Sequence, residues 1–343
     1  MPTLLYLLCV AAFCAAIFVT GVHNASNAIA VPVRTRAMTP VAALVVSALF
    51  NGAGVILAYM LIKEYEASWL VVPGGTPILL GIVCALTTTA AWGTITWAMR
   101  MPSSATHALI GALAGVAWYA HTDGFENYGF VHTIFTTALA PLLLLPPLTF
   151  LLSWVLVFPF YRLALRTAPH RVNSTSREVL AVSTAGISLL HGLQVGQRYL
   201  LLLLLSGVLA PFTSAVSFDK APATLMIVCA VLVAAILAAG TLTGGWRIGY
   251  TFTHRMVRLD PLRGATAQGT TAAVLAAGQF VLQLPFSSSH LAVASALGAG
   301  VNQRHASVSA RVVRQILLTW VITFPACFLL AVALMSVTGL FFE

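Results

Sequence analysis

Long apolar stretches alternate with short polar segments along the whole chain. They occupy approximately residues 1–20, 41–62, 78–99, 103–119, 131–158, 225–239, 272–284 and 312–340. Several reach the roughly 20 residues that a helix needs to cross a hydrocarbon core, and the ten-residue alternation typical of a membrane β-barrel is absent. The first run has no Lys or Arg before it, which favours a membrane span over a signal peptide. The pattern therefore predicts an all-α polytopic membrane protein.

The composition supports this prediction. Hydrophobic residues make up 59% of the chain and charged residues only 7%, whereas about a quarter of residues are charged in soluble domains. The formal charge of +9 does not indicate nucleic acid binding, because the basic residues lie in short segments between apolar runs. The five cysteines lie within apolar runs and show no CxxC spacing, which favours buried packing over redox or metal chemistry.

The positions of the charges predict the orientation of the chain in the cell (inner or plasma) membrane. Basic segments at residues 34–36, 162–177, 247–263 and 304–314 are expected to be cytoplasmic, and the third of them has a spacing that suits an amphipathic surface helix. The other connections have no basic excess and are expected to be external. Both termini are then external, and the chain forms roughly 10 membrane-crossing or re-entrant elements.

Two similar stretches break the apolar pattern deep inside the chain. PSSATHALIGALAG at residues 102–115 and PFSSSHLAVASALGAG at 285–300 each contain a proline, small hydroxyl residues, a histidine and a glycine-containing apolar helix. The charge pattern predicts that these two re-entrant-type hairpins enter the membrane from opposite sides, as in an inverted-topology repeat. We therefore expect a first repeat at residues 1–160, a basic cytoplasmic linker at 161–178 and a second, inverted repeat at 179–343.

The hairpin tips are candidates for binding an oxyanion. A helix that begins just after each proline presents backbone NH groups and the positive end of its dipole, and the neighbouring hydroxyls add donors. The candidate substrate-binding residues are Ser103, Ser104, Thr106, Ser287, Ser288 and Ser289. The alternative is that these side chains cap helices or pack at close helix contacts. His107 and His290 follow the hydroxyls and either fasten the tips or take part in protonation or ligand contact.

A second pair of polar stretches is expected to form the interrupted helix of each repeat. GVHNASNAIA contains His23, Asn24 and Asn27, and HGLQVGQRYL contains His191, Gln194 and Arg198. Their amides could coordinate a cation, orient an anion or bond neighbouring helices. Arg198 has the shape for a bidentate oxyanion contact, and the alternative is that it extends to the membrane interface.

At these motifs the chain resembles the inorganic phosphate transporter (PiT) family of secondary carriers, whose halves each carry a GANDVAN-like and a PVSTTHA-like signature. Residues 102–108 and 285–291 look like the later signatures, 21–27 like the first early one, and 191–198 like a degraded second one. The resemblance implies two inverted halves, an oxyanion held at Ser104, Thr106 and Ser287–Ser289, and a coupling cation at the early signatures. It implies transport rather than enzymatic activity.

The early signatures depart from the family pattern. Asn24 and Val195 stand at the aspartate positions, Arg198 stands at the final asparagine of the second signature, and none of the eight acidic residues lies in a signature. A sodium site without a carboxylate is weaker, so we expect proton coupling, because histidine titrates near neutrality. The candidates for coupling ion or proton binding are His23, Asn24, Asn27, His107, His191 and His290.

The sequence thus predicts a secondary carrier of inorganic phosphate that works by alternating access in the lipid bilayer. Sulfate is the alternative substrate, because hydroxyl and amide groups bind either tetrahedral anion. An intramembrane enzyme is disfavoured, since the apolar runs contain no Asp, Glu or HExxH motif. A non-transporting sensor or subunit is a third hypothesis. We expect no metal, no nucleic acid and no cofactor besides H⁺ or Na⁺ as coupling ion, and a homo-oligomer is compatible with the sequence.

Overall fold

The computed structural model describes residues 2–62, 78–120, 139–206, 208–209, 221–282, 286–301, 303 and 308–342. Every regular element within these residues is a helix. The α-helices are α1 (Pro2–Arg34), α2 (Pro40–Leu61), α3 (Ile78–Ala98), α4 (Ala105–Ala120), α6 (Ala140–Ala164), α7 (Pro169–Leu205), α8 (Ala223–Thr243), α9 (Trp246–Tyr250), α10 (Pro261–Ala277), α11 (Ser288–Val301) and α12 (Ala310–Phe342), and the π-helical segments are η3 (Thr251–Met256) and η4 (Gly278–Leu282). Seven of the described helices are long and apolar enough to cross a membrane. The predicted all-α polytopic membrane fold is confirmed.

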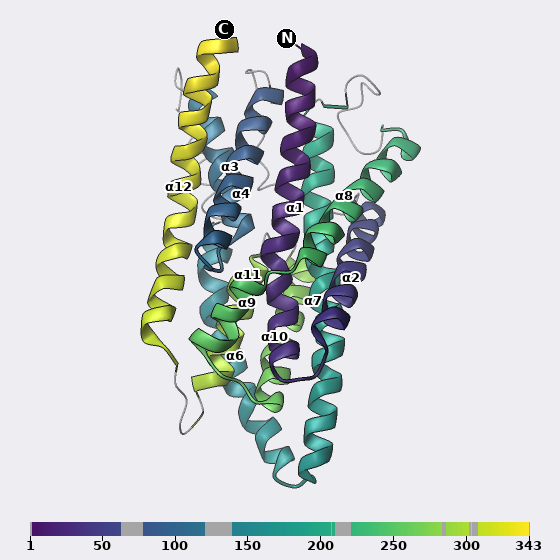
Figure 1. Ribbon diagram of the computed structural model, residues 1–343, viewed down its shortest axis with the longest axis vertical. Helices are drawn as coiled ribbons and strands as arrows, with labels where there is room; N and C mark the ends of the chain where they lie inside the picture. Colours follow the sequence, from purple (N-terminus) through teal and green to yellow (C-terminus); the bar gives the residue numbers. More distant parts are fainter. Residues whose placement is uncertain are drawn as a thin grey trace.

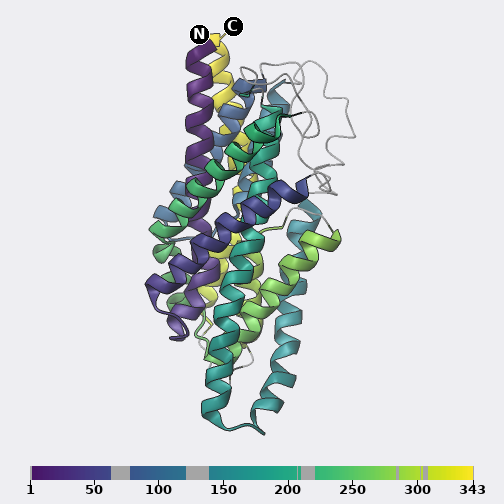
Figure 2. The same cartoon turned by 90° about the vertical axis from the view of Figure 1, so that its right-hand side faces the viewer.

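The two hairpins point toward each other from opposite ends of the molecule. In Figure 1 both chain termini lie at one end, and the turn between α6 and α7 lies at the other. Helices α3 and α4 form a hairpin on the side of the termini, whereas α10 and α11 form one toward the opposite end (Figures 1 and 2). This arrangement agrees with the predicted inverted repeats. Which end faces the cytoplasm stays a prediction.

Glycines allow the long helices of the two repeats to cross at very short distance. A Cβ atom on Gly192 of α7 would lie 2.0 Å from the backbone oxygen of Asn51 on α2, and one on Gly240 of α8 would lie 2.2 Å from that of Phe18 on α1. The facing positions on α2 and α1 are also glycines, Gly54 and Gly21. Small residues at such crossings let helix backbones approach in membrane proteins. The α1–α8 and α2–α7 crossings are therefore packed in the same way, through a pair of facing glycines.

The polar stretches of α1 and α7 do not break these helices. Both were expected to be interrupted, yet α1 continues through His23 and Asn27, and α7 continues through Gly192 and Arg198. Only the apolar pattern is interrupted, and the helical backbone continues. Polar side chains can stay in a membrane helix when neighbouring helices supply their hydrogen-bond partners. The early signatures are therefore held on rigid helices.

The expected linker is largely helical, and the expected amphipathic helix is shorter than the segment predicted for it. Helix α6 continues to Ala164 and α7 begins at Pro169, so helices occupy most of the predicted linker at 161–178. Basic residues marked the linker in the sequence, and arginine is compatible with a helix, so the charge pattern did not show where the helices end. The segment expected to suit an amphipathic helix, residues 247–263, is helical through α9 and η3 as far as Met256, with buried and exposed residues on this stretch, and an extended segment then leads to α10. The division into repeats at 1–160 and 179–343 stays a prediction.

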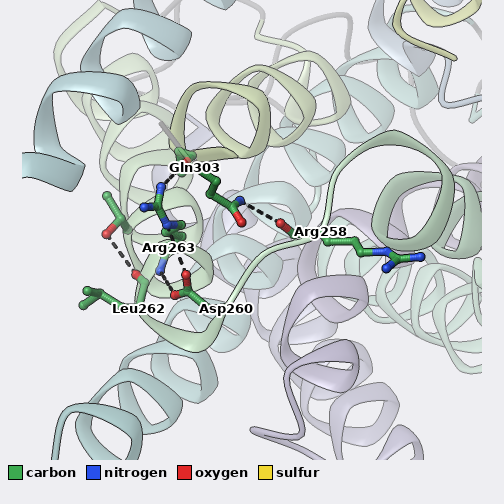
Figure 3. Close-up of polar contacts among 7 residues, drawn as sticks. Arg258, Asp260, Leu262, Arg263 and Gln303 are labelled. Atoms are coloured by element: carbon green, nitrogen blue, oxygen red, sulfur yellow. Dashed lines mark hydrogen bonds and ion pairs between the residues drawn. The ribbon is translucent and has the colours of Figure 1, made fainter. Parts of the chain in front are cut away.

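A cap at the start of α10 fixes the base of the second hairpin (Figure 3). Asp260 accepts hydrogen bonds from the backbone NH of Arg263 at 2.9 Å and from its Nε at 3.1 Å. Arg263 Nη1 also donates to the backbone oxygen of Ala299 on α11 at 3.1 Å, and Gln303 Nε2 donates to that of Arg258 at 2.8 Å. An Asp at the N-cap followed by Pro is a strong helix start, which explains why α10 begins at Pro261 and not near residue 272 as expected.

Several charged positions used for the predicted orientation lie outside the described residues. They are Lys63, Glu64, Glu66, Asp123, Glu126, Asp219, Lys220, Arg304 and Glu343, and Pro285 of the second hairpin motif lies outside as well.

Candidate functional site

The first polar cluster joins α1 to the tip of the second hairpin. Asn27 Nδ2 donates to Ser289 Oγ at 3.1 Å and to Ser288 Oγ at 3.3 Å. Both hydroxyls donate to Asn24 Oδ1, at 3.3 Å from Ser288 and 3.0 Å from Ser289, and Asn27 Nδ2 reaches the same oxygen at 3.0 Å. All four side chains are buried. The early signature of the first repeat thus binds the later signature of the second.

The second polar cluster joins α7 to the tip of the first hairpin. Arg198 Nη1 donates to Thr106 Oγ1 at 2.7 Å, and Arg198 Nε donates to the backbone oxygen of Gln194 at 3.0 Å. Thr106 Oγ1 in turn donates to the backbone oxygen of Phe286 at 3.1 Å, which ties the two hairpin tips together. Arg198 is only 6% exposed, so it does not extend to the membrane interface as the alternative interpretation supposed.

These two clusters are the same contact made twice. Asn27 and Arg198 occupy the last position of the two early signatures, and Ser289 and Thr106 each directly precede the histidine of a later signature. Each early helix therefore contacts the hairpin tip of the other repeat through corresponding residues. The main chemical difference between the corresponding residues is that the second contact contains a guanidinium where the first contains an amide.

Two of the predicted binding serines cap their own helices. Ser104 Oγ accepts from the backbone NH of His107 at 3.1 Å, and Ser287 Oγ accepts from that of His290 at 3.3 Å. These are N-cap contacts at corresponding positions of α4 and α11. Ser103 lies against α1, where its backbone NH donates to His23 Nε2 at 3.0 Å. The capping interpretation therefore describes Ser104 and Ser287, whereas the hydroxyls that reach the other repeat are those of Thr106, Ser288 and Ser289.

The two signature histidines lie side by side where the hairpin tips meet. The ring centroids of His107 and His290 are 4.7 Å apart, and the His290 ring stacks on Trp320 of α12 at 3.9 Å. Trp320 Nε1 donates to the backbone oxygen of Pro102 at 3.1 Å. His191 lies elsewhere on α7, with Nδ1 2.9 Å from Oδ1 of Asn51 on α2. The structure therefore places His23, His107 and His290 at the tips and His191 at the α2–α7 crossing.

Sequence reasoning missed several of the polar partners around these clusters. They are Asn51, Gln268, Gln279 and Trp320. Gln268 Nε2 donates to the backbone oxygen of Asn27 at 3.0 Å, and Gln279 Nε2 donates to Gln197 Oε1 at 2.9 Å. An isolated amide in an apolar helix was the available signal for Asn51. A tryptophan in a long apolar run gave no such signal.

Two buried polar groups at corresponding positions have unused hydrogen-bonding capacity. The amide oxygen and nitrogen of Gln194 and the Nδ1 atom of His23 have no hydrogen-bond partner among the described residues. Gln194 and His23 each precede the aspartate position of an early signature by one residue. Buried polar groups normally have partners, so these atoms are available to a ligand or to water.

The clusters enclose little free volume. The cavity beside His23 and Ser103 measures ≈ 10 Å³, and that between Asn24, Asn51 and Ser288 measures ≈ 0 Å³. A cavity needs about 10–15 Å³ of such volume for one water molecule. Neither cavity therefore has room for a tetrahedral anion in this conformation.

Comparison with known proteins shows the family. A family model described as "Phosphate transporter family" matches residues 20–331. The chain belongs to this family. It is 32% identical over 338 residues to a protein of Rhizobium meliloti and 30% identical over 329 residues to one of Bacillus subtilis, each named "Probable low-affinity inorganic phosphate transporter". These alignments cover 96% and 94% of this chain and 95% and 93% of the relatives.

A solved structure has the same fold. It is titled "The sodium-dependent phosphate transporter" and matches with a TM-score of 0.73 over 98% of this chain and 99% of that chain, at 17% identity. Both bacterial relatives are named for phosphate and lend no support to the sulfate alternative. Membership of a transporter family is consistent with the expectation that the chain is not an enzyme.

Proposed function

We propose that this chain carries inorganic phosphate across the cytoplasmic membrane by alternating access between its two repeats. The family membership and the names of its relatives support phosphate as the substrate. The observation that carries the mechanism is the crossed contact, in which Asn27 contacts Ser289 and Arg198 contacts Thr106. The two repeats are joined by two corresponding contacts, one made by α1 and one by α7. One of these contacts can open while the other stays closed.

Phosphate binds to the side-chain groups that are engaged in these crossed contacts in the present conformation. Arg198 supplies a buried guanidinium that matches phosphate oxygens in a bidentate manner, and Thr106, Ser288 and Ser289 supply hydroxyl donors. Gln194 supplies an amide whose hydrogen-bonding atoms lack partners among the described residues. Ser104 and Ser287 act indirectly, because they cap the helices whose N-termini face the anion.

The two crossed contacts act as two gates. When the second hairpin tip leaves α1, the hydroxyls of Ser288 and Ser289 become available to the anion on one side. When the first hairpin tip leaves α7, Arg198 and Thr106 separate and the other side opens. Because the repeats are inverted, these movements expose the same central site to opposite faces of the membrane.

Protons rather than sodium ions drive the transport. The acidic residues that the structure describes, Glu178 and Asp260, are exposed, so the described core offers a cation only neutral oxygens. Histidines lie at the hairpin tips, and an imidazole ring can accept and release a proton. The solved structure with this fold is named for sodium dependence, and sodium coupling is therefore the alternative that an experiment must separate.

Counterflow of labelled phosphate in proteoliposomes tests the proposal, with a pH gradient and a sodium gradient imposed separately. Arg198→Gln removes the charged hydrogen bonds, each worth about 1.5–3 kcal/mol, and should weaken phosphate affinity by roughly ten-fold or more. Arg311→Gln, an exposed arginine on α12, is the matched control and should transport normally. Normal transport by Arg198→Gln contradicts the proposed site. Uptake that follows sodium and ignores the pH gradient contradicts proton coupling alone.

A further inference from the structure

A long apolar groove lies between α6, α7 and α10, away from the hairpin tips. Its volume is ≈ 490 Å³, far larger than the cavities at the crossed contacts. The α6 side is formed by large apolar side chains and the α10 side by small residues, while one arginine of α7 joins the lining. The lining includes Leu152, Phe160, Thr167, Arg171, Gly269 and Ala273.

The groove extends from the membrane-spanning part of α6 to the basic corner between α6 and α7. Its lining begins at Leu152 and ends at Thr167, which lies just beyond α6. At 1.5 Å per residue this is about 22 Å along the helix axis. Half of a bilayer's hydrocarbon core is about 15 Å thick, so an acyl chain of one leaflet fits along this length. Figure 2 shows the α6–α7 corner at the end of the molecule opposite the termini.

The open end of the groove is positively charged. Arg171 lines it, and Arg162 and Arg166 belong to the same corner, whereas Arg177 and Glu178 line a separate pocket beside α7. Anionic lipid headgroups in the cytoplasmic leaflet attract basic residues with about 1 kcal/mol per Lys or Arg. The charge at this end therefore matches a lipid phosphate, and the apolar interior matches its acyl chain.

We propose that this groove is a binding site for an anionic phospholipid, with one acyl chain lying along α6 and the headgroup phosphate at Arg171. A second copy of the chain fits the groove less well. In the commonest dimers, which have two-fold symmetry, the same patch of both subunits meets, so both copies of this basic corner would lie in one interface. The lipid neutralises these charges, whereas a dimer brings them together.

Glycines provide a matched pair of variants. A Cβ on Gly269 meets nothing within 4 Å, and Gly269 lines the groove, so Gly269→Leu fills the space without striking the backbone. Gly186 on α7 also has nothing within 4 Å of its Cβ position and does not line the groove, so Gly186→Leu is the control. Ala273→Leu fills the groove from a different residue and covers the case in which the first variant folds poorly.

The experiment measures lipid retained by the full-length protein after detergent extraction, with added phosphatidylglycerol or phosphatidylcholine, by native mass spectrometry. The wild type should retain phosphatidylglycerol preferentially, and Gly269→Leu and Ala273→Leu should lose most of it, while Gly186→Leu keeps it. Arg171→Gln should bind phosphatidylglycerol about five-fold more weakly, and the control Arg311→Gln should bind it as the wild type does.

Three outcomes overturn the proposal. They are equal retention of the two lipids by the wild type, full retention of phosphatidylglycerol by both groove-filling variants, and loss of a dimer in those variants with lipid content unchanged. The last of these would assign the groove to a second copy of the chain. Phosphate counterflow is not the readout, so the result does not depend on the proposed transport function.

Discussion

The crossing of α2 and α7 offers a sharp test of how the site is held. Gly192 contacts the backbone of Asn51, and a methyl group at this position has no space. Its Cβ would lie 2.0 Å from the Asn51 oxygen, whereas real Cβ contacts essentially never fall below 3.0 Å. The helices must therefore separate by at least 3.0 − 2.0 = 1.0 Å in Gly192→Ala. The nearest atoms belong to backbone, which cannot move away as a flexible side chain can.

The cost of this movement is measured against Gly186→Ala on the same helix. Gly186 has nothing within 4 Å of its Cβ position, so its substitution brings only the gain in helix propensity of about 1 kcal/mol. The same gain applies at Gly192 and cancels in the difference between the two variants. What remains is the overpacking cost of about 1–3 kcal/mol. This corresponds to roughly 2–6 °C in melting temperature, taking about 2 °C per kcal/mol.

Thermal melts of both variants in one detergent provide the stability assay, and phosphate counterflow provides the functional one. Arg198 lies on the same helix as Gly192 and donates to Thr106 at 2.7 Å, so a displaced α7 should also weaken transport. Gly186→Ala should melt at or above the wild-type temperature and transport normally. Equal melting temperatures for Gly192→Ala and Gly186→Ala would show that the crossing is not as close as described.

Three further predictions concern the crossed contacts and the surface. Asn27→Ala and Ser289→Ala should be non-additive by about 0.5 kcal/mol or more in a double-mutant cycle of melting, and additivity would show that their 3.1 Å contact does not stabilise the protein. Arg198→Asn, which gives the two early signatures the same last residue, should make a cysteine introduced at Gln194 more equally accessible to thiol reagents from the two sides, and unchanged accessibility would contradict unequal gates. Burial and two neighbouring arginines lower the pKa of His254 below its ordinary 6.5. The unfolded chain then binds a proton more readily, so the folded protein should lose stability as the pH falls below 6.5. His254→Gln should reduce this loss when melting temperatures are compared above and below that pH.

The hairpin tips could be predicted from sequence because they interrupt apolar surroundings locally. Proline, small hydroxyls and a histidine within an oily stretch are visible without any knowledge of partners, and the charge pattern gave their opposite orientation. The polar residues of α1 and α7 were visible for the same reason. Their helical continuity was not, because a polar residue in an apolar run signals a need for partners and says nothing of whether the backbone bends.

The partners themselves could not be predicted. Trp320 stacks on His290, and Asn51 contacts His191, from helices distant in sequence. The pairing of Asn27 with the second tip and of Arg198 with the first arises because each early helix packs against the other repeat. Such pairings depend on how the repeats interlock in space. The capping contacts of Ser104 and Ser287 could not be predicted for a related reason, since they depend on helix starts at residues 105 and 288.

The symmetry of the crossed contacts and the asymmetry of their chemistry together suggest how this carrier is biased. A neutral amide holds the α1 gate at 3.1 Å, and a guanidinium holds the α7 gate at 2.7 Å. Charge-assisted hydrogen bonds are shorter and roughly twice as strong as neutral ones. The α1 gate has four neutral hydrogen bonds between Asn24 or Asn27 and Ser288 or Ser289, whereas the α7 gate has the charged hydrogen bond from Arg198 to Thr106. Under the proposed mechanism, phosphate opens the α7 gate by replacing Thr106 as the partner of Arg198, whereas opening the α1 gate requires its four weaker hydrogen bonds to break together.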